Sequence, residues 1–404
     1  MRPLALACAI TATVVAVLSA EPRIRPAAST GQSDEQRALT STYSRAFGTG
    51  ADFRTLLVHP EAVKGVLPFA NYILRESTLT PRHRDLLILR TAWNTRSAYL
   101  WSKHERGVFT APIVVPTAGP PIDPFAGEAL GKIAGRSTGF SDFERTLLRA
   151  ADELHQFSFI RDDTWAAMAK DYNVHQLMDA AFTVAEMTMM AAIVNSVQTD
   201  LEPGWVKFER MGARPSPSRD VAMTLPRPRI DPVVLAETTP EIRAMLDPAG
   251  SGRDIAAVYR TFARHPTLYP PRQILSEYIR TKSTLSPRVR EMLILRIGWR
   301  CRSAYEWAAH APAGRRAGLT DDQVKMLARS GYDGWSAADA AIVRTADELF
   351  TDDTISDATW KALDDPFDER QLLDLLITTG GYRMVSMVLN TFGVPAEPSS
   401  EPFP

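Results

Sequence analysis

The stretch from Ser283 to His310 reads STLSPRVREMLILRIGWRCRSAYEWAAH, and a close copy of it, STLTPRHRDLLILRTAWNTRSAYLWSKH, runs from Ser77 to His104. The two segments are identical at 17 of 28 positions without a gap. Unrelated segments share far fewer positions, so the chain contains an internal duplication. Each copy is expected to fold into an equivalent unit.

The second copy of this stretch has the pattern of two consecutive helices. Ser286 is a favourable N-cap, and Pro287 suits the first helical position, where its missing N–H costs nothing. Apolar residues then recur at helical spacing as far as Ile297. A second helix can begin after Ser303, because Ser303 and Glu306 have the spacing of a capping box.

Three side chains that can move protons lie on these two predicted helices. We expect Glu291, Glu306 and His310 to face one another across the corner between the helices. His310 would act as general acid or base, because an imidazole titrates near neutral pH. Glu291 would accept a proton or orient His310, and Glu306 would be a second carboxylate or fix the imidazole tautomer. Tyr305 and Arg296 are candidates for holding an anionic substrate.

The same residues also allow a purely structural interpretation. Glu306 could serve only as a capping residue, and His310 with Glu291 could form a satisfied buried pair. Arg296 would then be a surface or interface ion partner. On the residues alone, the catalytic and the structural interpretations both stay open.

The motif L-S-P-R-x-R-E-x-x-I-L-R, followed by R-S-A-Y-E-W-x-x-H and later by A-G-L, resembles the carboxymuconolactone decarboxylase family. Its relatives include the alkylhydroperoxidase D-like proteins. The resemblance implies an all-α protein of two tandem alkylhydroperoxidase D-like helical domains. It also implies cofactor-independent decarboxylation or proton transfer on a small unsaturated carboxylic acid or lactone. In the peroxidase branch, a Glu is followed by Cys-x-x-Cys-x-x-x-His, and the two cysteines fall here on Ser303 and Glu306.

Three other functions are compatible with the sequence. Cys301 precedes a predicted helix N-terminus, where the helix dipole lowers a thiol pKa, so a one-cysteine peroxide-reducing activity is an alternative. No second cysteine is present to resolve a sulfenic acid. A metal site is not expected, since Glu291, Glu306 and His310 form a thin ligand set for zinc or copper. A non-catalytic ligand-binding or scaffold protein is the third alternative.

The first copy departs from the second at the candidate site. Asp85 stands in place of Glu291, His104 in place of His310, and Leu100 in place of Glu306. Shortening Glu to Asp withdraws the carboxylate by about one methylene, which a hydrogen bond does not tolerate without other shifts. We therefore expect the first site to be altered or structural.

The chain begins with an apolar run, Leu4–Ala20, after Arg2. Its length and the small residues at its end predict a signal peptide over residues 1–20 and export to the periplasm or medium. An uncleaved membrane anchor is the alternative, favoured slightly by Arg23 and Arg25. Removal of the signal would leave Cys301 as the only cysteine.

The rest of the chain divides by composition into four predicted segments. They are a polar lead (21–31), a first domain (32–198), a Pro-rich linker (199–232) and a second domain (233–397). The formal net charge of −1 gives no electrostatic reason to expect nucleic acid as a partner. The expected partners are a small-molecule substrate and further copies of the chain in a trimer-like homo-oligomer, with no stable membrane insertion after signal cleavage.

Two local patterns carry further expectations. His59 precedes Pro60, which pushes it out of helical geometry, so a turn before a helix is favoured over a ligand role. Gly380 and Gly381 stand together inside a predicted helix, which costs about 2 kcal/mol relative to alanine. Such a pair indicates close packing against another helix or room for a ligand.

Overall fold

The computed structural model describes residues 21–105, 140–203, 205, 225–252, 254–396 and 401–404. Within these ranges the chain consists of helices and their connections, and it contains no strand. The all-α class is thereby confirmed. The predicted signal peptide lies outside the described residues.

Helices of the first half of the chain come in the order that the sequence indicates. They are α1 (Asp34–Phe47), α2 (Ala51–Leu56), α3 (Pro60–Asn71) with the π-helical turn η1 (Tyr72–Glu76), α4 (Pro81–Asn94), α5 (Ala98–Glu105), α7 (Asp142–Phe157), α8 (Asp162–Met168) and α9 (Val174–Ser196).

The second half repeats this order after two short elements of its own. It comprises η2 (Leu235–Glu237), α10 (Pro240–Leu246), α11 (Ala257–Phe262), α12 (Tyr269–Glu277) with η3 (Tyr278–Lys282), α13 (Pro287–Arg300), α14 (Ala304–Arg316), α15 (Asp321–Leu327), α16 (Ala337–Thr351), α17 (Asp357–Asp364) and α18 (Glu369–Phe392).

The duplicated stretch folds in the same way in both copies. Helices α4 and α13 begin and end at equivalent residues, and each is capped by a hydroxyl, of Thr80 or Ser286, that accepts the N–H three residues on. Each helix is followed by an arginine, Arg96 or Arg302, in the left-handed backbone region. This residue turns the chain sharply, so that the next helix folds back along α4 or α13.

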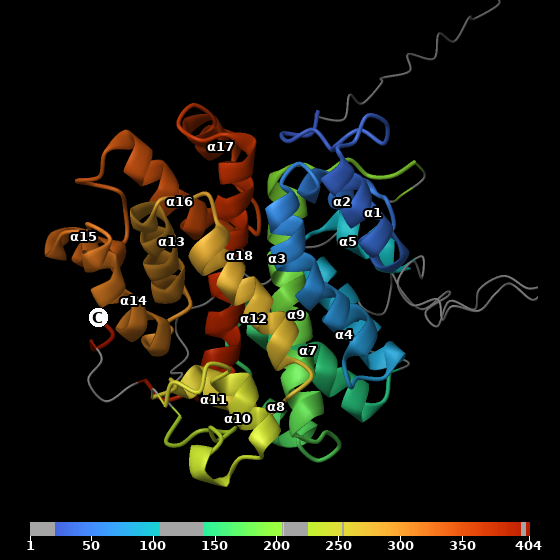
Figure 1. Cartoon of the computed structure of the whole chain (residues 1–404), viewed down its shortest axis with the longest axis vertical. Coiled ribbons are helices and arrows are strands. Elements are labelled where there is room, and N and C mark those ends of the chain that lie inside the picture. Colours follow the sequence, from blue (N-terminus) through green and yellow to red (C-terminus); the bar gives the residue numbers. More distant parts are fainter. Residues whose placement is uncertain (1–20, 106–139, 204, 206–224, 253, 397–400) are drawn as a thin grey trace, which may run out of the picture.

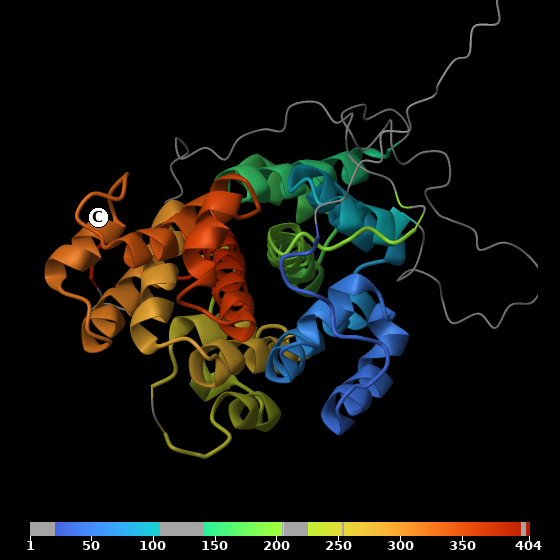
Figure 2. The same cartoon turned by 90° about the horizontal axis from the view of Figure 1, so that it is seen from above.

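Helices α9 and α18 pack against each other in the centre of the molecule, and the remaining helices of each half surround them (Figures 1 and 2). Both are long and apolar enough to span a membrane, but their apolar windows are 100% and 94% buried inside the protein. Buried apolar side chains of both halves form one continuous cluster. The halves therefore share a core, and the domain limits drawn from the sequence stay a prediction.

A histidine from each half closes a polar cluster in the other half. His59, which turns the chain before α3, places its Nε2 atom 3.3 Å from Asp374 Oδ2 and 3.1 Å from the hydroxyl of Tyr278. Tyr278 donates to Asp374, which also accepts the N–H and hydroxyl of Thr284 at 2.6 and 2.7 Å. Asp374 is fully buried, so these contacts fix the junction between the halves.

The equivalent cluster on the other side uses the equivalent residues. The Nε2 atom of His265 lies 3.3 Å from Asp179 Oδ2 and 3.1 Å from the hydroxyl of Tyr72. Asp179 accepts from Tyr72 at 2.8 Å and from the N–H and hydroxyl of Thr78 at 2.6 and 2.7 Å. The duplication thus creates two pseudo-symmetric locks that only the paired halves can form.

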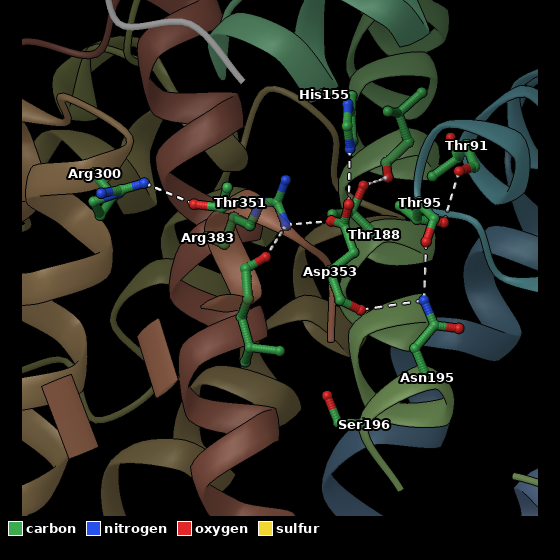
Figure 3. A network of polar contacts seen from close by, with 12 residues as sticks. Thr91, Thr95, His155, Thr188, Asn195, Ser196, Arg300, Thr351, Asp353 and Arg383 are labelled. Carbon is green, nitrogen blue, oxygen red and sulfur yellow. Dashed lines mark hydrogen bonds and ion pairs between the residues drawn. The ribbon is translucent and has the colours of Figure 1, made fainter. Parts of the chain in front are cut away.

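A third group of polar contacts links the halves beside α9 and α18 (Figure 3). The amide of Asn195 donates to the carbonyls of Thr95 and Asp353 at 2.9 and 3.1 Å. Asp353 is fully buried, and its carboxylate contacts His155 at 2.9 Å and Arg383 at 2.5 Å. Every ion of this group has an opposite charge or hydrogen-bond partner within reach, as buried charges require.

The two adjacent glycines of α18 have different neighbours. A Cβ atom on Gly380 would lie 2.6 Å from Cγ and 3.3 Å from Cα of Met189 on α9. A Cβ on Gly381 would meet the terminal methyl of Ile279 at 2.6 Å. Close helix packing thus accounts for Gly380, whereas Gly381 lines a cavity described below.

Gly380→Ala is therefore expected to destabilise the protein by about 1–2 kcal/mol, because overpacking against the α9 backbone outweighs the helix propensity gained. Gly381→Ala is the matched control. Its new methyl meets only a rotatable methyl, so the change should stay within about 1 kcal/mol. Urea unfolding of both variants measures the difference, and equal midpoints would contradict this account of the α9–α18 contact.

Candidate active site

The corner between α13 and α14 brings together the three candidate proton-transfer residues. Glu291 lies in the middle of α13, and Glu306 and His310 lie one turn apart on α14. Ser303 caps α14 by accepting the N–H of Glu306, at 3.5 Å. Both carboxylic side chains are buried, whereas 19% of the His310 side chain is exposed.

The imidazole of His310 lies between the two carboxylates. Its Nδ1 atom is 2.7 Å from Glu291 Oε2, and its Nε2 atom is 3.4 Å from Glu306 Oε2. The edge-to-face ring of Tyr382, with a centroid distance of 5.0 Å, limits how the imidazole can tilt. Glu306 thus does more than cap a helix, since its carboxylate is directed at the imidazole.

Burial and charge shift the titration of this cluster. Burial opposes a charge on His310, but the hydrogen bond with Glu291 and the negative charge of Glu306 prevail and raise the pKa of His310 above its usual value. Burial also raises the pKa of Glu306, against the opposing effect of His310 and Arg272. Both groups can therefore carry an exchangeable proton near neutral pH, as acid–base catalysis requires.

A cavity of about 190 Å³ opens beside His310 and Glu306. Residues of α11, α12, α14 and α18 form its wall, and the polar members are Arg272, Gln273, Ser276, Tyr259, Tyr305 and Tyr382. Tyr305, predicted to contact substrate, is among them. The candidate acid–base group thus faces a space that can hold a small molecule.

Two residues of this region were missed by the sequence interpretation. Arg272 on α12 borders the cavity and is 6% exposed. Glu186 on α9 is fully buried, and burial raises its pKa to about 8 although the charge of Arg272 opposes the shift. The only signal for Arg272 is a charged residue in line with Leu268 and Leu275 on the buried stripe of its helix.

Arg296 has a structural role in place of the substrate contact expected from the sequence. Its guanidinium forms a bidentate pair with Asp347, at 2.7 and 2.6 Å, and donates to the carbonyl of Leu327 at 3.0 Å. It also stacks on Trp299, 4.7 Å from the ring centroid. These contacts consume its donors and hold α13 to α16, and Arg296 takes no part in lining the cavity.

Cys301 is also placed in the protein interior. It is 1% exposed and packs in a small apolar cluster with Ile297, Ala346 and Phe350. Its carbonyl accepts from the amide of Asn390 at 2.8 Å. Buried cysteines in apolar surroundings are poorly reactive, so this position does not favour the peroxide-reducing alternative.

The first half has no equivalent exposed imidazole. Asp85 and His104 are 1% and 3% exposed, and burial, together with the charges of Lys103 and Arg84, lowers the pKa of His104 well below its usual value. His104 is therefore neutral at physiological pH, unlike His310.

An ion pair fills the first-half positions that correspond to the cavity wall. Lys103 pairs with Asp52, which also accepts from the hydroxyl of Tyr99 at 2.8 Å. The equivalent residues of the second half are Ala309 and Val258, and both border the cavity. Small and apolar side chains at these two positions thus leave space that the first half occupies with charge.

Comparison with known proteins agrees with the resemblance drawn from the motifs. Residues 266–347 match the model of the carboxymuconolactone decarboxylase family. The matched segment carries Arg272, Glu291, Glu306 and His310. No curated protein matches the chain.

Proposed function

With residues 266–347 as a domain of the carboxymuconolactone decarboxylase family, we propose that the chain is a cofactor-independent acid–base enzyme acting on a small unsaturated carboxylic acid or lactone. One observation carries the proposal: the imidazole of His310 lies between two carboxylates at the wall of a cavity. Two acids and a histidine of shifted pKa, beside a small cavity, are the usual components of a proton-transfer site.

Each of the three residues has a role that follows from its position. The hydrogen bond from Nδ1 to Glu291 fixes the tautomer and orientation of the imidazole. The Nε2 atom of His310 is then the one that exchanges a proton with substrate. Glu306, 3.4 Å away, takes or returns that proton between turnovers.

Two reactions are compatible with this arrangement. In a decarboxylation, the bond from carbon to the leaving carboxylate breaks, carbon dioxide departs, and the electron pair remains on the conjugated carbons. His310 Nε2–H then protonates the carbon and is itself reprotonated from solvent by way of Glu306. In a proton shift, Glu306 removes a proton from one carbon and His310 delivers one to another. Neither reaction needs an external oxidant.

The pH dependence of turnover follows from the raised pKa of His310. The protonated imidazole is fully present below the usual value of about 6.5 and is lost as the pH rises through the raised value. We expect kcat/KM to fall on the alkaline side with an apparent pKa above 6.5. Glu291→Gln should move this limb to lower pH, because it removes a contact that raises the pKa, and an unmoved limb would reject His310 as the acid.

The test of the proposal is a screen of unsaturated carboxylic acids and lactone acids in D₂O, with carbon dioxide release and deuterium incorporation as readouts. Peroxide reduction is assayed in parallel. Glu306→Gln should abolish deuterium incorporation, while Cys301→Ser should leave it unchanged. Loss of a peroxide-reducing activity with Cys301→Ser alone would reject the proposal, and the absence of any turnover would favour the ligand-binding alternative.

A further inference from the structure

A buried cation borders the cavity without a hydrogen-bond partner for most of its guanidinium. The Nε and Nη1 atoms of Arg272 make no hydrogen bond to any residue in the described part of the chain. Only 6% of Arg272 is exposed, and its guanidinium lies 5.9 Å from the centroid of the Phe262 ring. Buried donors left unsatisfied cost free energy, so such a group points to a ligand that completes its hydrogen bonds.

The acids around Arg272 do not neutralise it by direct contact. Glu186 is fully buried, and neither carboxylate oxygen makes a hydrogen bond to a described residue. With a pKa raised by burial to about 8, it holds its proton at neutral pH. Glu306 is also shifted toward its protonated form. The positive charge of Arg272 is therefore left for whatever enters the cavity.

We propose that Arg272 binds a carboxylate group of the substrate and so makes the cavity selective for anions. A guanidinium presents two parallel N–H groups that match a carboxylate, which gives both affinity and orientation. Arg272 comes from α12, and His310 comes from α14 across the same cavity. A bound acid would therefore have its charged end at Arg272 and its reactive carbons toward His310. The inference rests on the proposed function for its catalytic consequence, but anion binding is separable from turnover.

The first half lacks this anion-binding group. Val66 stands at the position equivalent to Arg272 and is fully buried. Glu186 itself stands at the position equivalent to Gly381, which lines the second-half cavity. The residues that would receive a carboxylate thus belong to one copy of the duplication, as do the residues that would protonate it.

The experiment compares carboxylates with neutral molecules of the same shape. Crotonate, 2-furoate and benzoate are titrated against the full chain by calorimetry, each beside its own amide. The wild-type protein should bind at least one of these acids and bind its amide at least tenfold more weakly. Arg272→Gln should weaken binding of the acid by about 10- to 100-fold, as expected for loss of a charged hydrogen-bond pair, and leave the amide unchanged.

Three further variants keep the proposal testable. Arg272→Lys retains the charge but not the fork, and should bind the acid at least threefold more weakly, which decides the matter if Arg272→Gln does not fold. Ala309→Phe, at an exposed position of the cavity wall, should block binding without touching Arg272. His310→Gln should retain anion binding, so failure of catalysis and failure of binding are distinguishable. Equal binding of acid and amide by the wild type, or unweakened binding of the acid by a folded Arg272 variant, would overturn the proposal.

Discussion

Replacement of His310 by glutamine is expected to lower kcat by about 10²- to 10⁴-fold, the usual contribution of a positioned general acid or base. Glutamine can keep a hydrogen bond to Glu291, but it cannot exchange a proton with substrate. The KM for the anionic substrate should change little, because Arg272 and not His310 is proposed to hold the carboxylate. Steady-state kinetics on the substrate found in the acid screen measures both quantities.

The duplication supplies the matched control for this variant. His104 is the equivalent histidine of the first half, but it is buried and its pKa is low. His104→Gln should therefore leave kcat within about twofold of the wild type once folding is verified by circular dichroism. Equal losses in the two variants would mean that the second-half histidine acts through stability and not through chemistry.

Much of the fold was accessible from the sequence because it depends on local patterns. The hydroxyl caps of Thr80 and Ser286, the prolines after them and the apolar spacing that follows define α4 and α13 to the residue. The convergence of Glu291 and His310 also follows from helix geometry, since the sharp turn at Arg302 folds α14 back along α13. These features require no knowledge of how the two halves pack.

The contacts that escaped prediction all depend on packing between segments distant in the sequence. His59 forms a turn, as expected, but its ring is completed by Asp374, which is 315 residues away. Arg296 looked accessible from the motif, yet Asp347 takes its guanidinium. Arg272 gave no motif signal, because its role depends on a cavity formed by several helices. Periodicity can place a residue on a buried face, but not assign its partner.

The two halves have diverged at the cavity while keeping the junction. The Asp179 and Asp374 clusters use the same residue types at equivalent positions, so selection for a stable junction explains their identity. At the cavity, Lys103 and Asp52 replace Ala309 and Val258, and the first half fills the space with an ion pair. One half thus contributes rigidity, and the other carries the candidate chemistry.

Replacement of Asp374 by alanine is expected to reduce the free energy of unfolding by about 3–5 kcal/mol. The change strands the N–H of Thr284, the hydroxyl of Tyr278 and the ring of His59 in the interior, and each unsatisfied group costs about 1–3 kcal/mol. Total stability is about 5–15 kcal/mol for most proteins, so this loss is a large fraction. Urea unfolding at neutral pH measures it, with the exposed Asp365→Ala as a control that should change little.

The pseudo-symmetric partner and the pH dependence make this prediction specific to the lock. Asp179→Ala should cost a similar amount, because its cluster repeats the same contacts. Burial opposes ionisation of Asp374, but its hydrogen bonds prevail and lower its pKa, so its contribution is present above the unfolded value of about 3.9 and is lost as the pH falls through the lower folded value. Wild type and Asp374→Ala should therefore converge in stability at acid pH. A constant difference down to pH 2 would show that the aspartate acts by packing and not by its charge.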